Sequence, residues 1–231
     1  MSRKMEGVAV KPAKALIIFS IFTLFSCATE SQRGLAVEQP LAASRPYYGP
    51  RSPIAVGKFD NRSSFMRGLF SDGQDRLGGQ AKTILITHLQ QTNRFTVLDR
   101  DNMEEARREA EIGSTAQELK GATYLITGDV TEFGRRELGK YLFFGILGRG
   151  KTQMAYSKVS LYVVDTRTTE VVCSAQGAGE VELSDMEVAG FGTSASYDST
   201  LNGKVLDLAI REAVNGLTNS IDSGLWKPAG N

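Results

Sequence analysis

The segment GILGRGKT, residues 145–152, matches the phosphate-binding pattern G-x-x-x-x-G-K-S/T at every position. A working phosphate loop follows a buried strand and opens a helix, because the free N–H groups at the helix N-terminus hold the phosphates. Residues 141–144 suit the strand, but residues 152–165 are rich in β-branched and aromatic side chains and show no helical period. The segment is therefore predicted to be a glycine-rich turn between two strands, and we expect it to bind no nucleotide.

The second candidate for chemistry is Cys27, at the end of an N-terminal signal. Basic residues precede an uninterrupted apolar run over residues 15–25, which is typical of a secretory signal and too short to cross a bilayer as a helix. The run ends in Leu24-Phe25-Ser26-Cys27, which resembles the lipobox of bacterial lipoproteins. The resemblance implies a signal peptide over residues 1–26 and a mature chain that begins at Cys27 with a diacylglycerol and an acyl group, such as palmitate. Ala28, in place of an aspartate, implies sorting to the outer membrane. The alternative is an ordinary signal peptide with an incidental cysteine.

Other reactive groups are few. The chain has one histidine and two cysteines, so neither a disulfide scaffold nor a Cys/His metal cluster can be assembled. A formal net charge of +1 argues against nucleic-acid binding. His88 falls on the apolar stripe of a helix and Cys173 lacks a partner after processing, so both are predicted to be structural. We therefore expect no enzymatic activity, no metal and no cofactor beyond the lipid on Cys27.

The elements that position these residues follow a tether. Residues 27–52 have no sustained apolar period and contain Pro40, Pro46 and Pro50, which predicts an extended tether and a single folded domain over residues 53–231. Apolar alternation predicts strands over 54–59, 95–98, 122–133, 158–165 and 170–173, with a turn over 166–169. Helical spacing predicts a helix over 77–91 and another after a capping box formed by Asp101 and Glu104. A C-terminal helix carries the apolar stripe Leu206, Ile210, Ala213, Leu217 and Ile221. The order indicates a mixed α/β domain without internal repeats.

Two hairpins, over about residues 134–158 and 173–199, are candidates for membrane insertion. From Cys173 to Asp185 an apolar or small face alternates with a polar face, over about the length of a membrane-spanning strand. The face predicted to meet lipid comprises Ala175, Gly177, Gly179, Val181, Leu183 and Phe191. Four strands cannot close a barrel alone, so insertion requires every edge to pair with a neighbouring subunit, which implies a ring. The alternative is a soluble sheet with extended hairpins and one solvated face.

Several segments, taken in order, resemble the curli secretion lipoprotein family, which comprises CsgG and its holdfast-attachment relatives. They are Cys27 with its lipobox, the strand over 122–133, Phe144-Gly145-Ile146, the run over 161–165 with the turn that follows it, and the terminal Ile221-Asp-Ser-Gly-Leu-Trp226. The resemblance spans nearly the whole mature chain. It implies a periplasmic domain of anticodon-binding-like fold and two hairpins per subunit that jointly form an outer-membrane β-barrel in a cyclic oligomer.

The resemblance also implies a pore constriction in the loop after the first strand. In the family an aromatic pair and an asparagine form this constriction, and the aligned positions here are Gly68, Asp72 and Gly73. Aromatic and apolar residues lie nearby but out of register, so the candidate constriction loop comprises Phe65, Gly68, Leu69, Phe70, Asp72 and Gly73.

The predicted function is that of an outer-membrane lipoprotein, anchored by lipid and facing the periplasm, that forms an oligomeric channel. The channel exports curli-like or other surface protein subunits without nucleotide hydrolysis, and its partners are those secreted subunits or accessory lipoproteins. The alternative is a lipid-anchored periplasmic scaffold or regulator of envelope assembly that forms no pore.

Overall fold

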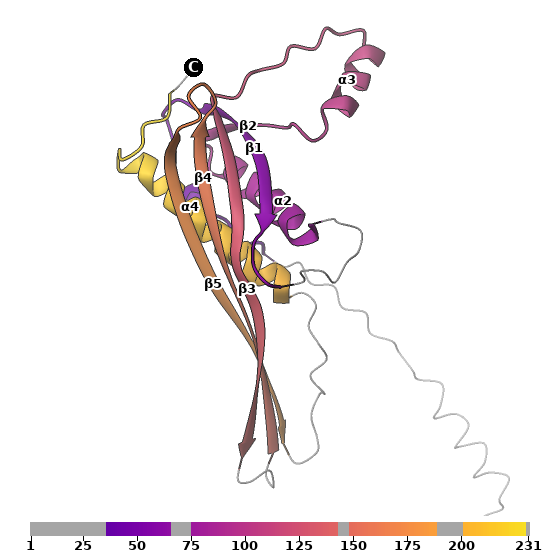
Figure 1. Ribbon diagram of the computed structural model, residues 1–231, viewed down its shortest axis with the longest axis vertical. Coiled ribbons are helices and arrows are strands. Elements are labelled where there is room, and N and C mark those ends of the chain that lie inside the picture. The colour runs from indigo at the N-terminus through magenta and orange to yellow at the C-terminus, as the bar shows by residue number, and fades with distance from the viewer. Residues whose placement is uncertain (1–35, 66–74, 143–147, 189–200, 230–231) are drawn as a thin grey trace, which may run out of the picture. The chain divides into compact units, whose positions relative to one another are not determined.

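Five strands form one mixed sheet in the computed structural model, which describes residues 36–65, 75–142, 148–188 and 201–229 (Figure 1). The strand order is β2-β1-β3-β4-β5. The strands are β1 (Ser52–Asn61), β2 (Phe95–Leu98), β3 (Tyr124–Leu142), β4 (Gly148–Asp165) and β5 (Val171–Val188). The helices are η2 (Leu41–Ser44, of 3-10 type), α2 (Arg76–Gln91), α3 (Met103–Ile112) and α4 (Leu201–Asp222). The mixed α/β class predicted from the sequence is confirmed.

The sheet combines a parallel part with an antiparallel meander. β1 lies between β2 and β3 and is parallel to both, whereas β3, β4 and β5 follow one another as antiparallel neighbours. The register between β3 and β4 shifts between Val130 and Glu132, which leaves Thr131 as an extra residue opposite Val159 and Lys158. The apolar pattern of the first predicted hairpin changes phase at this bulge, because one inserted residue reverses the faces of the strand that follows.

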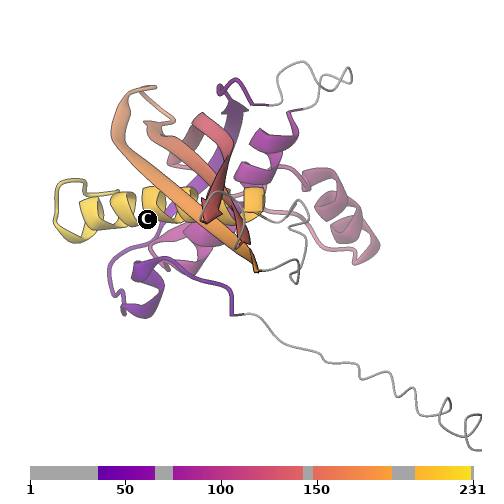
Figure 2. The ribbon, with the colours of Figure 1, turned by 90° about the horizontal axis from the view of Figure 1, so that it is seen from below.

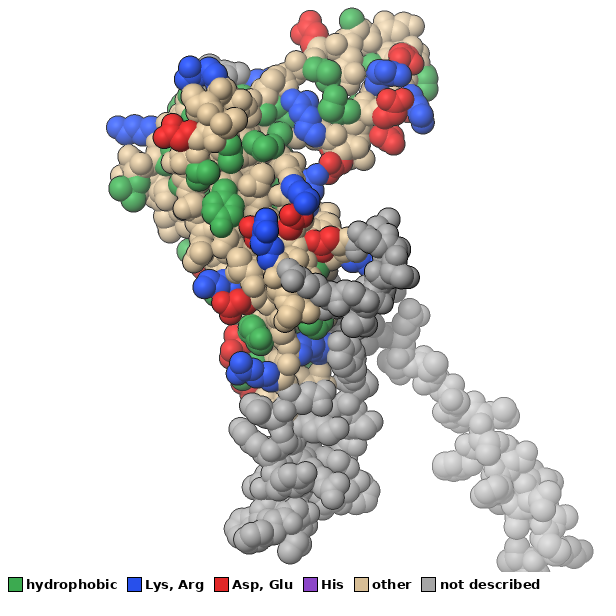
Figure 3. Space-filling model, viewed as in Figure 1, with side chains coloured by type: hydrophobic (Ala, Val, Ile, Leu, Met, Phe, Trp, Pro, Cys, Tyr) green, Lys and Arg blue, Asp and Glu red, His purple; other side chains and the backbone are tan. Residues whose placement is uncertain are grey.

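α2 and α4 cover one face of the sheet, and the core lies between them and the strands. α4 crosses β4 and β5 and also contacts α2 (Figure 2). The stripe predicted for the C-terminal helix is confirmed, because Leu206, Ile210, Ala213 and Leu217 are fully buried. No described helix covers the opposite face of the sheet, which the view in Figure 3 shows together with the charged side chains of α3.

The starts of α2 and α3 differ in how they are capped. Asp75 accepts a hydrogen bond from the N–H of Gly78 at 2.8 Å, which satisfies a free donor in the first turn of α2. The predicted capping box of Asp101 and Glu104 is wrong: α3 begins after Asn102, without a side-chain cap. Asp101 instead pairs with Lys82 Nζ at 2.6 Å, because it lies one residue too early to face the N–H groups of the helix.

The turn between β4 and β5 lies at the predicted position. The Asp165 carboxylate accepts hydrogen bonds from the N–H groups of Arg167 at 2.8 Å and Thr168 at 3.1 Å. These bonds favour the charged carboxylate and lower the pKa of Asp165. Thr169 has a φ of 61°, in the left-handed region, and closes the turn.

Candidate functional site

The three antiparallel strands continue past the rest of the sheet as a ribbon, defined here as residues 131–142, 148–158 and 178–188. β1 pairs with β3 only as far as Asn61 and Val130, whereas β3 and β4 remain paired as far as Leu142 and Gly148. β5 stays paired to β4 as far as Val188. In Figure 1 the ribbon leaves the body beyond the N-terminal end of α4. Among the described residues, no strand pairs from Thr131 onward with the edge of β3 that faces away from β4, and none pairs with the outer edge of β5.

The outer face of the ribbon is polar where its side chains are described. Gly134, Tyr156 and Glu180 lie in one cross-strand row, and Arg136, Met154 and Glu182 lie in the next. The ring of Tyr156 lies across Gly134, since a Cβ there would meet the ring atoms at 2.5 to 2.6 Å. The Arg136 guanidinium lies over the same ring, 5.3 Å from its centre. On this face β5 carries two glutamates, whereas β3 carries Arg136 and, nearer the body, Glu132, which pairs with Lys158 of β4 at 3.7 Å.

The prediction that the small residues of β5 face lipid is wrong for the part near the body, because α4 packs there. A Cβ on Gly177 would meet the backbone of Ala209 and Ala213, and one on Gly179 would meet Leu208 Cγ at 2.7 Å. Ala175 lies against Gly216 of the same helix. Small side chains on a strand let a helix approach closely, which gives the same sequence pattern as a lipid-facing strand.

The other three residues of the predicted lipid-facing set are Val181, Leu183 and Phe191. Val181 and Leu183 are partly buried against the core. Phe191 lies outside the described residues, as does the return segment of the second hairpin over 189–199. β5 itself is the third strand of a continuous meander, and it pairs with β4 along the whole described length.

The predicted constriction loop is held at its two ends by side chains that sequence reasoning missed. Asn61 donates its backbone N–H to Asp75 Oδ2 at 2.5 Å, which ties the end of β1 to the start of α2. The Asn61 side chain accepts from Ser63 and donates to the carbonyl of Phe65 at 2.9 Å. Phe65 packs on Phe133 at the base of the ribbon, with ring centres 4.6 Å apart. The neck of the loop therefore lies beside the ribbon. The other predicted residues, Gly68, Leu69, Phe70, Asp72 and Gly73, lie outside the described residues.

The predicted tether ends earlier than expected, because residues 38–50 are docked on the body. This segment, called the strap from here on, begins with an ion pair between Glu38 and Arg211 of α4. Leu41 donates its N–H to Asn215 Oδ1 at 2.9 Å, and Ala42 is buried to 3% exposure. A run with three prolines and no apolar period is typical of a free tether, yet an ion pair, a backbone N–H and one small buried side chain dock it on the body.

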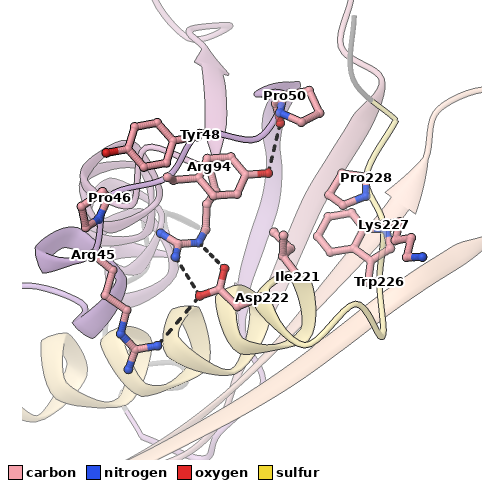
Figure 4. A pocket seen from close by; sticks show the side chains of 11 residues that line it. Arg45, Pro46, Tyr48, Pro50, Arg94, Ile221, Asp222, Trp226, Lys227 and Pro228 are labelled. Carbon is pink, nitrogen blue, oxygen red and sulfur yellow. Dashed lines mark hydrogen bonds and ion pairs between the residues drawn. The ribbon is translucent and has the colours of Figure 1, made fainter.

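Arg94 connects the strap with the C-terminal end of α4. Its side chain is 2% exposed and makes two bonds to Asp222 at the end of α4, from Nε at 2.9 Å and from Nη2 at 2.7 Å (Figure 4). Its Nη1 donates to the carbonyl of Ala42 in the strap at 3.1 Å, and the ring of Tyr47 lies 5.0 Å from the guanidinium. Arg94 and Asp222 are 128 residues apart, so no local pattern could have paired them.

An open pocket of about 520 Å³ lies between the strap and the C-terminal tail. Tyr47, Tyr48 and Trp226 contribute aromatic rings to its wall, and Arg45 and Lys227 contribute charge (Figure 4). The carboxylate in its lining belongs to Asp222, which Arg94 already engages, and the lining contains no Ser, Cys or His. The lining offers aromatic and charged surface for contact.

The other candidates for chemistry have structural surroundings. Gly148 to Thr152 lie in β4, a strand as far as Asp165, so this part of GILGRGKT opens no helix, while residues 145–147 lie outside the described part. His88 is 2% exposed and its Nε2 lies 2.9 Å from Asp207 Oδ1 between α2 and α4. Burial raises the pKa of the Cys173 thiol, which disfavours a reactive thiolate. Cys27 lies outside the described residues.

The described residues contain no group of three or more His, Cys, Asp or Glu side chains that could hold a metal ion. None of the helices among them is long and apolar enough to cross a membrane.

Comparison with known proteins gives a family and a relative. A family model described as curli production assembly/transport component CsgG matches residues 34–230. A protein of Neisseria meningitidis serogroup B (strain ATCC BAA-335 / MC58), named as lipoprotein NMB1126/NMB1164, is 61% identical over 206 residues, which cover 89% of this chain and 92% of the relative.

Similar solved structures are more distant. A PelC dodecamer from Paraburkholderia phytofirmans is 18% identical and covers 75% of this chain and 94% of its own, with a TM-score of 0.37. Lipoprotein GNA1162 from Neisseria meningitidis is 16% identical and covers 74% and 99%, with a TM-score of 0.34. A neuraminyllactose-binding hemagglutinin homologue from Helicobacter pylori is 11% identical and covers 80% and 94%, with a TM-score of 0.41. At this level of similarity the structures carry no argument about assembly or activity.

Proposed function

Because the chain belongs to the curli production assembly/transport component (CsgG) family, we propose that its copies form a ring in the outer membrane and export secreted protein subunits. In this proposal Cys27 carries the diacylglycerol and acyl anchor, and the domain faces the periplasm. The partners are further copies of this chain, the secreted subunits and accessory lipoproteins. The protein performs no catalysis and binds neither nucleotide nor nucleic acid.

The observation that carries the proposal is the ribbon with its two open edges. β3 continues as far as Leu142 although β1 stops pairing at Asn61, and β5 runs beside β4 as far as Val188. Long unpaired strand edges are templates for pairing with another chain, and natural proteins cover or interrupt them. Head-to-tail association of copies along these edges covers both and closes into a ring when the rotation between copies allows it.

Charge on the outer face of the ribbon favours this head-to-tail order. Arg136 lies on the β3 side, and Glu180 and Glu182 lie on the β5 side, all on the same face. A neighbouring copy in the same orientation brings its Arg136 toward Glu180 and Glu182 of the first copy. Pairing of two β5 edges, by contrast, would bring the glutamates of both copies together, so the charges disfavour a symmetric edge-to-edge dimer through β5.

The loop neck supports a role for the loop in passage through such a ring. Asn61 and Asp75 hold both ends of the loop beside the base of the ribbon, and Phe65 packs on Phe133 of the ribbon itself. Every copy in a ring of ribbons would therefore place the two ends of its loop at the same level, where the ribbon meets the body. Loops that start and end at one level of a ring are what a constriction requires.

The alternative function, a lipid-anchored scaffold without a pore, is favoured by one observation. α4 covers the small residues Ala175, Gly177 and Gly179, so β5 can meet lipid only from Glu180 to Val188, at the lower limit of a membrane-spanning strand of about 9 to 11 residues. The described outer-face side chains of this stretch include two glutamates. A scaffold would use the ribbon as an exposed binding edge in the periplasm instead.

One experiment distinguishes the export pore from the scaffold. The lipidated protein is extracted in detergent, examined for rings by electron microscopy and tested for conductance in planar bilayers. Discrete channels from ring-shaped particles support the export pore, and monomers without conductance refute it and leave the scaffold. Glu118→Arg, a charge reversal on an exposed loop, serves as the control for variants of the ribbon.

A further inference from the structure

The outer face of the sheet, opposite α2 and α4, carries one apolar row that crosses all five strands. Its members lie side by side in register: Leu98 on β2, Ala55 on β1, Leu125 on β3, Val164 on β4 and Val171 on β5. At the β5 end of the row Val171 is 55% exposed, and Tyr162, on the same face of β4, is exposed as well. No described helix covers the row (Figure 3), so apolar surface is left open at this end of the face.

Chain topology assigns a helix to this face. The connection from β1 to β2 contains α2, which packs on the same face of the sheet as α4. The connection from β2 to β3 contains α3, and it runs back across β1 to a third parallel strand. Because such crossovers are right-handed in nearly all proteins, a crossover in the reverse direction places its helix on the opposite face. The outer face is therefore the place for α3, yet α3 packs on none of the described strands.

Both ends of α3 are instead held away from the outer face by side chains at the end of β2. Before the helix, the Asp99 carboxylate accepts a hydrogen bond from the N–H of Asp101 at 2.9 Å, and Asp101 pairs with Lys82 of α2. After the helix, Arg100 Nη2 donates to the carbonyl of Lys120 at 2.5 Å. These bonds fix the two ends of residues 99–123, called the arm from here on. The arm stands off from the strands on the side of β1 and β2 (Figure 1).

α3 carries an apolar stripe that nothing in the described part of its own chain covers. Met103, Ala106 and Ala110 lie three and four residues apart and share one side of the helix. No residue of α3 is buried, and no side chain caps its N-terminus. Isolated helices shorter than about 12 to 15 residues are marginal in water, and α3 has 10. A surface that covered the stripe would therefore stabilise the helix.

We propose that α3 of one copy docks on the outer face of the neighbouring copy, with its stripe over Val164, Val171 and Tyr162. This inference rests on the proposed head-to-tail ring, in which the free edge of β3 receives β5 of the next copy. β1 and β2 lie on that same side of β3, so the arm projects toward the neighbour and toward the β5 end of its apolar row. Exchange of an identical element between copies is a low-cost route to assembly. Each outer face then receives the helix that its topology requires, from the adjacent copy.

Cross-linking between differently tagged copies tests this contact. Two versions of the full lipidated chain, both with Cys173→Ser, are co-expressed and extracted in detergent. One carries Ala106→Cys in the stripe and the other carries Val171→Cys in the row, and a short bis-maleimide joins thiols that lie close together. Arg108→Cys, on the opposite side of α3, replaces Ala106→Cys in the matched control. The three introduced thiols are at exposed positions, and circular dichroism checks that each variant is folded.

The stripe pair should give about tenfold more cross-linked heterodimer than the control pair, because docking raises the effective concentration of the two thiols. One chain that carries both Ala106→Cys and Val171→Cys should also cross-link between copies. An internal cross-link in a monomer overturns the inference, because it shows that α3 folds back on its own sheet. Rings in electron micrographs with equal yields from the stripe and control pairs overturn the inference and leave the ring. Selective cross-linking without rings or conductance supports the contact and refutes the pore, and monomers without cross-links refute both.

Discussion

Removing the negative charge of Asp222 should destabilise the domain, because Asp222 is the counter-ion of the buried Arg94. Asp222→Asn leaves the guanidinium of Arg94, 2% exposed, with its two backbone acceptors but without its counter-ion. One of the two hydrogen bonds from Arg94 is lost, because the amide keeps a single acceptor oxygen, and the other loses its anionic acceptor. A hydrogen bond to a charged group is worth about 1.5 to 3 kcal/mol, and breaking a buried ion pair on one side costs about 3 to 5 kcal/mol. Since Asp222 is 27% exposed and water can replace part of its contact, we expect the lower end, about 3 kcal/mol.

The assay is thermal unfolding of the lipidated protein in detergent, followed by circular dichroism. For a chain of this size a loss of about 3 kcal/mol lowers Tm by about 6 to 12 °C. Asp101→Asn is the matched control, because Asp101 also pairs with a basic side chain but is 55% exposed. An exposed pair contributes about 0 to 1 kcal/mol, so this variant should change Tm by no more than about 4 °C.

A double-mutant cycle separates the pair from other effects of the substitutions. Arg94→Met alone should be destabilising, and Arg94→Met with Asp222→Leu should recover much of the loss, because the combined change leaves no buried charge. If Asp222→Asn unfolds within 1 °C of the wild type, or if the two single changes add without coupling, the guanidinium does not depend on this carboxylate and the account of the strap is refuted.

Three further results are expected. Gly177→Val should prevent α4 from packing on β5 and abolish cooperative unfolding in the same assay. Ala178→Val, on the exposed face of the strand, should be tolerated. If the two variants unfold alike, α4 does not approach β5 closely at Gly177. Asp165 has a lowered pKa in the folded state, so its contribution to stability is present above its ordinary pKa of about 3.9 and is lost as pH falls through the lowered value. Asp165→Asn should therefore flatten the acid side of a curve of Tm against pH. An unchanged curve would contradict this expectation. Arg136→Glu should reduce ring formation in electron micrographs and Arg136→Glu with Glu180→Arg should restore it; no loss in the single variant would contradict head-to-tail order.

The elements of the body could be predicted because each carries a strong local period. The stripe from Leu206 to Leu217 corresponds to a buried face in the structure, and Ile54 and Val56 are buried in a strand whose other face, at Ala55, is buried too. The length of the strands could not be predicted in the same way. β3 continues from Phe133 to Leu142 through a polar and glycine-containing segment, where pairing with β4 rather than side-chain pattern determines the strand.

The face of β5 shows how one pattern can have two physical causes. Ala175, Gly177 and Gly179 alternate with polar residues, as lipid-facing positions would. The same alternation arises when small residues admit a helix, and the cue that favours the helix lies in another segment, where Ala209, Ala213 and Gly216 offer a small face in return. A strand read alone could not distinguish the two.

The strap was missed for a different reason. Its attachment depends on Arg94, Arg211 and Asn215, all of them far from residues 38–50 in sequence, and on backbone groups that leave no trace in a hydrophobic pattern. Contacts of this kind are specified by the folded body, so they can be found only after the body is built.

Asn61 connects the open edge of the ribbon with the loop that precedes α2. Its side chain accepts from Ser63 and donates to the carbonyl of Phe65, while the N–H groups of Arg62 and Ser63 both donate to the carbonyl of Val130. These bonds turn the chain away from β3 at the position where the bulge at Thr131 begins, so β1 cannot continue beside the ribbon. The residue that starts the candidate constriction loop is thus also the residue that frees the β3 edge. A change that extended β1 beyond Asn61 would pair the free edge of β3 and shorten the loop at the same time. The proposed ring depends on both the free edge and the loop, so it would lose both.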